Sequence, residues 1–334
     1  MPLISVIIPT YRHRDFVLTS LESVFAQTFT DYEVIVVNDG SPDDTGELLE
    51  PLSASGKIRY IEQANQGQAA ARNRGLAEAK GKFIAFLDDD DLWPKDKLSW
   101  QLEVLLEDPS IGVVAGIAEV IDESEKPLGT SQRLGEIRFC DLFSGNPIIS
   151  PGQTMIRADL LREIGGMNNR IWGCDDWDLW FRASAKARLV IFDRVGLRYR
   201  LHPGNAGNNM DRMLQNSIMV LETHLRALSG QGRRACAREG WHIVSGNFGR
   251  PAIKVIKEKI ASGDARAVFA ALRQLRPFVR PSLRDPRILA GFGIELLPRF
   301  AREVFNRRIR GQQQSKRQKA GWAPSPVIST SERA

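Results

Sequence analysis

The hydrophobic pattern of the first 110 residues alternates between two kinds of segment. Continuous apolar runs, typical of strands buried on both faces of a parallel sheet, occur at 4–8, 33–37, 58–62 and 82–87. Helical spacing or alanine-rich sequence follows at 16–29, 42–52 and 67–80, and Pro94 marks the start of a further helix. This repeated alternation predicts a mostly parallel α/β sheet with helices on its faces.

The pattern is less regular after residue 111. We expect strands at 113–121, 189–192 and 197–201, and helices at 158–164 and 175–187. Residues 124–150 have the composition of loops. Residues 210–228 place leucine and isoleucine on one side of an amphipathic helix.

Length and charge divide the chain into regions. The 334 residues suffice for about two domains. We expect an α/β domain over 1–230, a helical basic region over 231–310 and a disordered polar tail over 311–334. Residues 250–334 contain 19 Lys and Arg against 6 Asp and Glu, a net charge of +13, whereas the rest of the chain carries −7. This asymmetry indicates that the basic region faces an anionic partner.

Composition excludes several classes of protein. Apolar residues make up 43% of the chain and charged residues 26%, which is typical of a globular chain with a buried core. Cys140, Cys174 and Cys236 are widely separated and form no CxxC pair, so we expect neither a zinc ribbon nor a disulfide framework. Reduced cysteines and the lack of a signal-peptide pattern favour the cytoplasm. No apolar window approaches the ~20 residues of a membrane-spanning helix.

The strongest chemical signal is the run of four aspartates at 88–91, which directly follows an apolar strand. Adjacent carboxylates repel one another unless a cation or a donor-rich ligand compensates their charge. Mg²⁺ or Mn²⁺ bound to a phosphate needs only one or two protein carboxylates. The alternative is a solvated acidic turn in which Asp91 caps the next helix.

Other polar strand ends are weaker signals. Asp39 follows the second strand and could accept hydrogen bonds from a base or ribose, or it could cap a helix. Tyr11 could stack on a planar ligand or belong to the core. Arg72 could reach a phosphate or form a structural ion pair.

Two further signals lie in the second half of the chain. At 174–180, three carboxylates and two tryptophans begin a helix, where acids are also favoured by the helix dipole. His202 follows a strand and could be a phosphate contact, a metal ligand or structural.

The order of these motifs resembles the family 2 inverting glycosyltransferases of the GT-A fold, bacterial type. The resemblance covers about residues 3–205. It rests on 5–11 (SVIIPTY), 36–41 (VVNDGS), 65–75 (NQGQAAARNRG), 86–93 (FLDDDDLW), 176–180 (DWDLW) and 199–202 (YRLH).

The resemblance implies a role for each motif residue. Pro9, Tyr11, Asp39, Arg72, Asp88, Asp89 and Arg200 would contact the nucleotide sugar. Asp90 and His202 would hold Mn²⁺ or Mg²⁺. Asp176 would be the general base, taking a proton from an acceptor hydroxyl that displaces the nucleoside diphosphate. The family usually has Glu-Asp where this chain has Asp175-Asp176, so Asp175 is the alternative base.

The implied partners are a nucleoside-diphosphate sugar, a UDP-sugar above all, and a saccharide or lipid-linked acceptor in bacterial polysaccharide, lipopolysaccharide or other glycoconjugate synthesis. One alternative is a sugar nucleotidyltransferase, but residues 11–15 lack the glycine-rich loop expected of one. Another is a non-catalytic domain that binds a nucleotide sugar and regulates a partner.

The basic region predicts peripheral association with an anionic membrane. Residues 296–305 place leucine, phenylalanine and valine on one side of a helix and arginine on the other, as an interfacial helix requires. We therefore expect the protein at the inner face of the cell membrane. The alternative is that these helices pack on the α/β domain. We expect no nucleic-acid partner, because few aromatic residues interleave with the arginines and no nucleic-acid module is recognisable.

Overall fold

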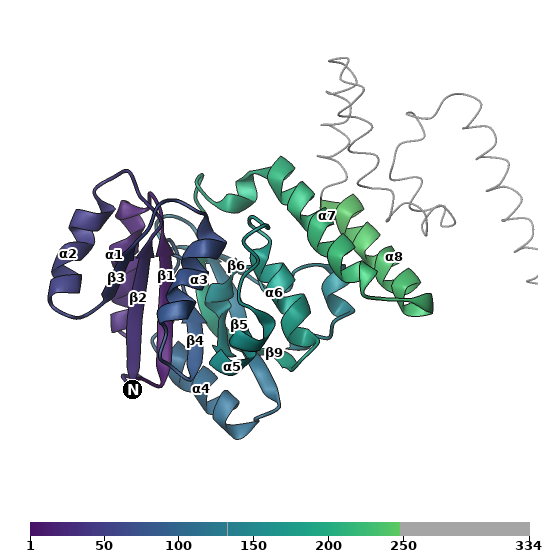
Figure 1. Cartoon of the computed structure of the whole chain (residues 1–334), viewed down its shortest axis with the longest axis horizontal. Coiled ribbons are helices and arrows are strands. Elements are labelled where there is room, and N and C mark those ends of the chain that lie inside the picture. Colours follow the sequence, from purple (N-terminus) through teal and green to yellow (C-terminus); the bar gives the residue numbers. More distant parts are fainter. Residues whose placement is uncertain (132, 248–334) are drawn as a thin grey trace, which may run out of the picture.

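The computed structural model describes residues 1–131 and 133–247, and Figure 1 colours them along the chain. The predictions for 250–334, including the interfacial helix and the polar tail, lie outside the described residues. In the described part, no helix is long and apolar enough to cross a membrane.

The strands of the described residues join one sheet. They are β1 (Ile4–Thr10), β2 (Tyr32–Asn38), β3 (Arg59–Glu62), β4 (Phe83–Phe86), β5 (Ile111–Ile121), β6 (Pro127–Thr130), β7 (Gly135–Glu136), β8 (Thr154–Arg157) and β9 (Arg188–Arg200).

The helices alternate with these strands. The α-helices are α1 (Arg14–Phe25), α2 (Thr45–Ala54), α3 (Gln68–Glu78), α4 (Lys97–Glu107), α5 (Ala158–Ile164), α6 (Asp175–Ser184), α7 (Met210–Arg226) and α8 (Gly230–Asn247). Short 3₁₀ helices are η1 (Asp141–Ser144), η2 (Pro151–Gln153) and η3 (Ala206–Asn208).

The sheet has the order β3-β2-β1-β4-β8-β5-β9-β7, with β6 paired to β5. Strands β1 to β4 pair in parallel, β8 runs antiparallel to both β4 and β5, and β5 pairs in parallel with β9. The predicted α/β class with a mostly parallel sheet is therefore confirmed. The carboxyl ends of β1, β2 and β4 meet at one edge, so the polar residues that follow them lie together.

Both faces of the sheet are buried, which explains the continuous apolar runs. Val6 and Ile8 belong to the apolar cluster that includes residues of α1, α2 and α4. Ile7 belongs to the opposite cluster, which includes residues of α3, α5, α6 and α7. Successive side chains of a strand point to opposite faces, so every position of β1 is apolar or shielded.

The structure differs from the sequence predictions in the second half. The strands predicted at 189–192 and 197–201 are one strand, β9, which continues through a register irregularity against β5. Close contact between Gly116 and Gly196 lets the two strands cross this irregularity, because a Cβ on Gly116 would lie 2.6 Å from the Gly196 nitrogen. Residues 124–150 contain β6, β7 and η1 rather than loop alone.

The last described helix packs against the α/β domain. Helix α8 contacts α7 and η1, and Figure 1 shows α7 and α8 side by side. Cys236 of α8 is buried, and its Sγ lies 3.0 Å from Sγ of Cys140 just before η1. The first part of the predicted basic region thus lies on the α/β domain.

The close packing of α3 on β1 gives a test of the fold. A Cβ on Gly75 would lie 2.4 Å from Cγ2 of Ile7, so Gly75→Ala should force the helix and strand apart. We expect the free energy of unfolding to fall by about 1–3 kcal/mol despite the better helix propensity of alanine. Urea denaturation measures the change. Gly129→Ala is the matched control, because a Cβ there meets nothing within 4 Å. Equal stability of the two variants would contradict this packing.

Candidate active site

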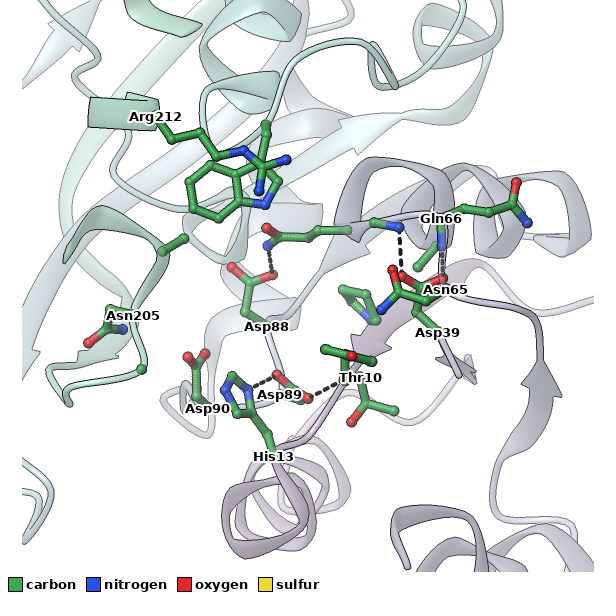
Figure 2. Close-up of a pocket in the computed structure, with 18 of the residues that line it drawn as sticks. Thr10, His13, Asp39, Asn65, Gln66, Asp88, Asp89, Asp90, Asn205 and Arg212 are labelled. Carbon is green, nitrogen blue, oxygen red and sulfur yellow. Dashed lines mark hydrogen bonds and ion pairs between the residues drawn. The ribbon is translucent and has the colours of Figure 1, made fainter. Parts of the chain in front are cut away.

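A cavity of about 640 Å³ lies at the carboxyl ends of β1, β2 and β4 (Figure 2). Its wall also includes the loop before α3 and residues of the loop between β9 and α7. The predicted site residues on this wall are Pro9, Tyr11, Asp39, Asp88, Asp89 and Asp90. Residues from five separate motifs of the sequence therefore surround one cavity, since Tyr199 of the 199–202 motif also lies on its wall.

Asp39 fixes the loop that leads into α3. Its Oδ1 accepts hydrogen bonds from the Gln63 side chain at 2.8 Å and from the backbone N–H of Gln66 at 2.9 Å. Its Oδ2 accepts the N–H of Gly67 at 2.7 Å, where a φ of 90° favours glycine. A carboxylate has about four acceptor positions, so one remains for a ligand in the cavity.

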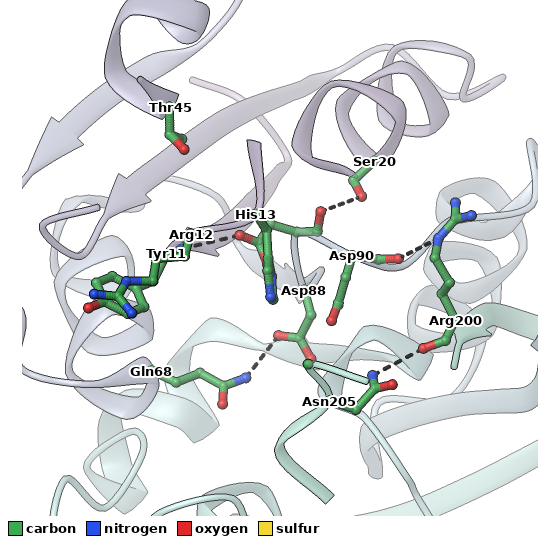
Figure 3. A network of polar contacts seen from close by, with 12 residues as sticks. Tyr11, Arg12, His13, Ser20, Thr45, Gln68, Asp88, Asp90, Arg200 and Asn205 are labelled. Carbon is green, nitrogen blue, oxygen red and sulfur yellow. Dashed lines mark hydrogen bonds and ion pairs between the residues drawn. The ribbon is translucent and has the colours of Figure 1, made fainter. Parts of the chain in front are cut away.

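Asp88 is held by three donor side chains, two from α3 and one from the residue before η2. Gln68 donates to it at 3.2 Å (Figure 3), Arg72 of α3 forms an ion pair with it, and Ser150 Oγ donates at 3.1 Å. The other end of the Arg72 guanidinium donates to Asp175 at 2.9 Å. Arg72 is only 2% exposed, and the two carboxylates outweigh its burial and keep its pKa above the usual value. The guanidinium therefore ties α3 to β4 and α6 instead of facing the cavity.

Asp89 is bound by the loop after β1. It accepts the N–H of Tyr11 at 3.2 Å, and its Oδ1 lies 2.8 Å from Nδ1 of His13. Burial lowers the pKa of His13, but the hydrogen bond to Asp89 and the charges of the neighbouring aspartates outweigh it and raise that pKa to about 9. His13 thus compensates Asp89, and the sequence analysis did not predict this.

Asp90 contacts His202, which belongs to the loop after β9. Nε2 of His202 is 2.9 Å from Oδ2 of Asp90. Arg200 is buried, and its Nε donates to the backbone carbonyl of Asp90 (Figure 3). Its backbone N–H donates to the carboxylate of Asp91. Arg200 therefore stabilises the acidic loop through contacts outside the cavity, and it is not among the residues of the cavity wall.

The donor atoms around Asp90 fit a divalent cation. One oxygen of Asp90 and one nitrogen from each of His13 and His202 all lie within 4.8 Å of one another. A carboxylate oxygen beside imidazole nitrogens is a donor set that Mn²⁺ accepts. The predicted residues Asp90 and His202 are therefore brought together, and His13 joins them.

Asp176, the predicted base, has a pKa suited to proton transfer near neutral pH. Burial and the nearby charge of Asp175 raise its pKa to about 7, against the lowering effects of Arg72 and of hydrogen bonds from Asn146 and Trp177. Asn146 donates to its Oδ2 at 3.0 Å. Asp176 is buried and is not on the wall of the 640 Å³ cavity.

Asp175 differs from its neighbour because it is paired with Arg72. It lines a smaller hollow of about 120 Å³ beside the main cavity, together with Trp172 and Arg212. The Arg212 guanidinium lies 4.1 Å from the centre of the Trp172 ring, and both residues also line the main cavity. Figure 2 shows Arg212 on the side of the cavity opposite His13.

Sequence reasoning missed four residues of the site. Gln68 lies in the 65–75 motif, Trp172 in the loop between α5 and α6, and Arg212 in α7, and no local pattern marked any of them as a site residue. His13 stands two positions after Tyr11, in the loop after β1, and this place at a strand end is the signal that could have pointed to it.

The chain is similar in sequence to known glycosyltransferases. The profile of the family described as Glycosyl transferase family 2 matches residues 5–165. An uncharacterized glycosyltransferase of Rickettsia prowazekii, RP339, is 30% identical over 221 residues, which are 64% of this chain and 69% of that protein. An uncharacterized glycosyltransferase of Rickettsia felis is 45% identical over 210 residues, which are 60% of this chain. The matched part spans about a third of that longer relative (33%).

Solved structures share the fold. The crystal structure of S. aureus TarS 1–349 with UDP-GlcNAc superposes with a TM-score of 0.65 at 20% identity, over 96% of this chain and 92% of that one. The mannosyltransferase PcManGT of Pyrobaculum calidifontis, in complex with GDP-Man and Mn²⁺, gives a TM-score of 0.58 at 19% identity, over 87% of this chain and 86% of that one. The sequence relatives, the shared fold and the order of the motifs around one cavity lead to one conclusion: the chain belongs to glycosyltransferase family 2.

Proposed function

We propose that this protein transfers a sugar from a nucleoside-diphosphate sugar, a UDP-sugar above all, to a hydroxyl of a saccharide or lipid-linked acceptor, with inversion at the anomeric carbon. The observation that carries the proposal is the grouping of Asp88, Asp89 and Asp90 with His202 at one end of a cavity. Acidic residues beside an imidazole form a place for a cation and, through it, for a diphosphate.

The cavity supports a nucleotide sugar as the ligand. Its volume of about 640 Å³ lies within the ~300–1,000 Å³ common for small-molecule sites. Tyr11 and the remaining acceptor position of Asp39 would bind the base, while Asp88 and Asp89 would lie nearer the ribose and diphosphate. In the solved structures of similar fold, TarS contains UDP-GlcNAc and PcManGT contains GDP-Man. We expect a ligand of the same class here.

The buried ion pair supports Asp176 rather than Asp175 as the base. Burial raises the pKa of Asp175, and the charge of Arg72 opposes this rise. The carboxylate of Asp175 already accepts a hydrogen bond from Arg72, so this oxygen is engaged and less available to accept a proton. Asp176 has no such cation bonded to it, and a base with a pKa near 7 is matched to neutral conditions. Asp176 would take the proton of the acceptor hydroxyl as that oxygen attacks the anomeric carbon.

Asp90 and His202 would hold Mn²⁺ or Mg²⁺. Such a cation, when bound, neutralises the charge that develops on the departing nucleoside diphosphate. Arg200 would keep the backbone of Asp90 in place through the hydrogen bond from its Nε, which is 3.0 Å long. Arg72 would act in the same way on Asp88 and Asp175, as a positioning residue.

We further propose that the loops at 124–150 and 203–211 shape the acceptor site. We retain the proposal that the basic region associates with the anionic inner face of the cell membrane and that the α/β domain ends near residue 230. The location in the cytoplasm and the glycoconjugate pathway are likewise proposals.

One experiment separates this function from the alternatives. The full chain is incubated with a panel of nucleotide sugars, with and without Mn²⁺, and the release of free nucleotide is measured. A glycosyltransferase releases a nucleoside diphosphate and transfers the sugar. A nucleotidyltransferase forms or consumes pyrophosphate instead, and a non-catalytic binding domain releases nothing while still binding its ligand.

The role of Asp90 predicts metal-dependent donor binding. Calorimetry should show that UDP binds more tightly with Mn²⁺ than with EDTA, and Asp90→Ala should abolish the difference because one of the cation's ligands is lost. Asp96→Ala is the control, because Asp96 is partly exposed and paired with Arg194 outside the cavity. Equal Mn²⁺ dependence in Asp90→Ala and the wild type would remove Asp90 from the metal site.

The role of Asp176 predicts a loss of rate without a loss of stability. Asp176→Asn should slow transfer by about 10²–10⁴-fold while the affinity for UDP is kept. Its melting temperature at pH 8 should be equal or higher, because a buried charge is removed and Asn146 can still donate a hydrogen bond. Asp175→Asn should instead lower the melting temperature, since Arg72 loses one of its two carboxylates. Normal transfer by Asp176→Asn together with inactive, folded Asp175→Asn would identify Asp175 as the base.

The raised pKa of Asp176 predicts a pH dependence. A general base must be deprotonated, so kcat should fall about tenfold per pH unit below a pH of about 7 and level off above it. The measurement is kcat from pH 5 to pH 9 at saturating donor and metal, with circular dichroism as the check on folding. A profile that stays flat down to pH 5 would contradict a base with this pKa.

A further inference from the structure

His13 stands between two carboxylates of the acidic loop (Figure 2). It precedes α1, and its Nδ1 lies 2.8 Å from Oδ1 of Asp89. Its ring lies edge-on to the ring of His202, with the ring centres 5.4 Å apart and an angle of 83° between the planes. Two imidazoles therefore meet at Asp90 from loops that follow different strands, β1 and β9.

The hydrogen-bond partner of Nδ1 determines whether Nε2 of His13 has a lone pair for a metal ion. Asp89 is an acceptor, so the neutral imidazole of His13 carries its proton on Nδ1 and has a free lone pair on Nε2. The N–H of Tyr11 holds the second oxygen of Asp89 and so fixes the carboxylate. A carboxylate that accepts a hydrogen bond from one ring nitrogen is the usual support of a histidine whose other nitrogen binds a metal.

The distance between Asp90 and His202 suits a shared cation. Nε2 of His202 and Oδ2 of Asp90 are 2.9 Å apart, and adjacent ligands of an octahedral ion at ~2.1 Å are separated by about 3 Å. The His13 nitrogen completes a set of three donor atoms that lie within 4.8 Å of one another. Space is left beside these rings, because Gly204 has no side chain: a Cβ there would lie 3.1 Å from Nδ1 of His202 and 3.8 Å from Nε2 of His13.

We propose that His13 is a third protein ligand of the divalent cation, oriented by Asp89, so that this chain holds the ion with two imidazoles and one carboxylate. The proposal rests on the metal site of the proposed function and adds a ligand to it. Its consequence is metal preference. Imidazole nitrogen favours transition metals, whereas Mg²⁺ prefers oxygen, so the site should select Mn²⁺ or Co²⁺ over Mg²⁺.

A competing role for His13 is that of a cation that contacts the diphosphate directly. In that case His13 would remain protonated, would not touch the metal, and would affect nucleotide binding alone. Metal binding measured without nucleotide separates the two roles.

The experiment measures metal binding to the full chain with MnCl₂ or MgCl₂ alone, without nucleotide, at one fixed pH. His13→Asn is the variant of choice, because the Asn amide can still donate to Asp89 but nothing replaces Nε2. We expect the affinity for Mn²⁺ to fall about 10–100-fold and the affinity for Mg²⁺ to change less than threefold. The preference for Mn²⁺ should therefore largely disappear.

His224→Asn is the matched control. His224 is also a buried histidine 2.8 Å from an aspartate, Asp178, but it packs between α6 and α7 and is not among the cavity's lining residues. Its substitution should leave Mn²⁺ affinity within twofold of the wild type. Unchanged Mn²⁺ affinity in folded His13→Asn would overturn the proposal, as would an equal loss in both variants.

A second measurement needs no variant. Pulsed electron paramagnetic resonance of Mn²⁺ on the wild-type chain detects the nitrogens of bound imidazole. We expect the couplings of two imidazoles, and a single one would overturn the proposal. The readout is also independent of catalysis: two imidazoles on Mn²⁺ in a protein that transfers no sugar would refute the proposed function alone, whereas sugar transfer with one imidazole would refute only this inference.

Discussion

The structure of the site depends on how the negative charge of four consecutive aspartates is compensated. Three of them have a different cationic or imidazole partner, and the fourth, Asp91, accepts a hydrogen bond from a backbone N–H. Asp88 pairs with Arg72, Asp89 with His13, Asp90 with His202, and Asp91 accepts the N–H of Arg200. These partners come from α3, the loop after β1, the loop after β9, and β9 itself. Without them the carboxylates would have to stay in water or take up protons.

Arg72 joins this acidic loop to the site of the proposed base. Its guanidinium bridges Asp88 at the end of β4 and Asp175 at the start of α6. Loss of one partner from a buried ion pair is costly, about 3–5 kcal/mol, because a charge is left without compensation. The same bridge holds the charge of Asp175 beside Asp176, and this charge, together with burial, raises the pKa of Asp176. The stability of the fold and the pKa of Asp176 therefore both depend on the charges that Arg72 joins.

Two of the predicted site residues do not line the cavity. Arg72 and Arg200 were predicted to contact the nucleotide, but both are buried and hold the acidic loop from behind. A sequence shows that an arginine lies near a motif, but it does not show which way the guanidinium points. Strand order places these contacts: β4 lies between β1 and β8, so other elements pack beside its acidic end while Asp88, Asp89 and Asp90 line the cavity.

The sequence by itself determined the alternation of strands and helices, the α/β class and the motifs that identify the family. These features are local, because the hydrophobic period of a helix and that of a strand each show which face of the segment is buried. The tertiary structure alone decided the long-range pairings: that β9 is one strand across the Gly116–Gly196 contact, that Asp175 rather than Asp176 pairs with Arg72, and that His13 meets His202 at Asp90. Such pairings depend on which loops the sheet order brings to one edge, and no periodicity in the chain records that order.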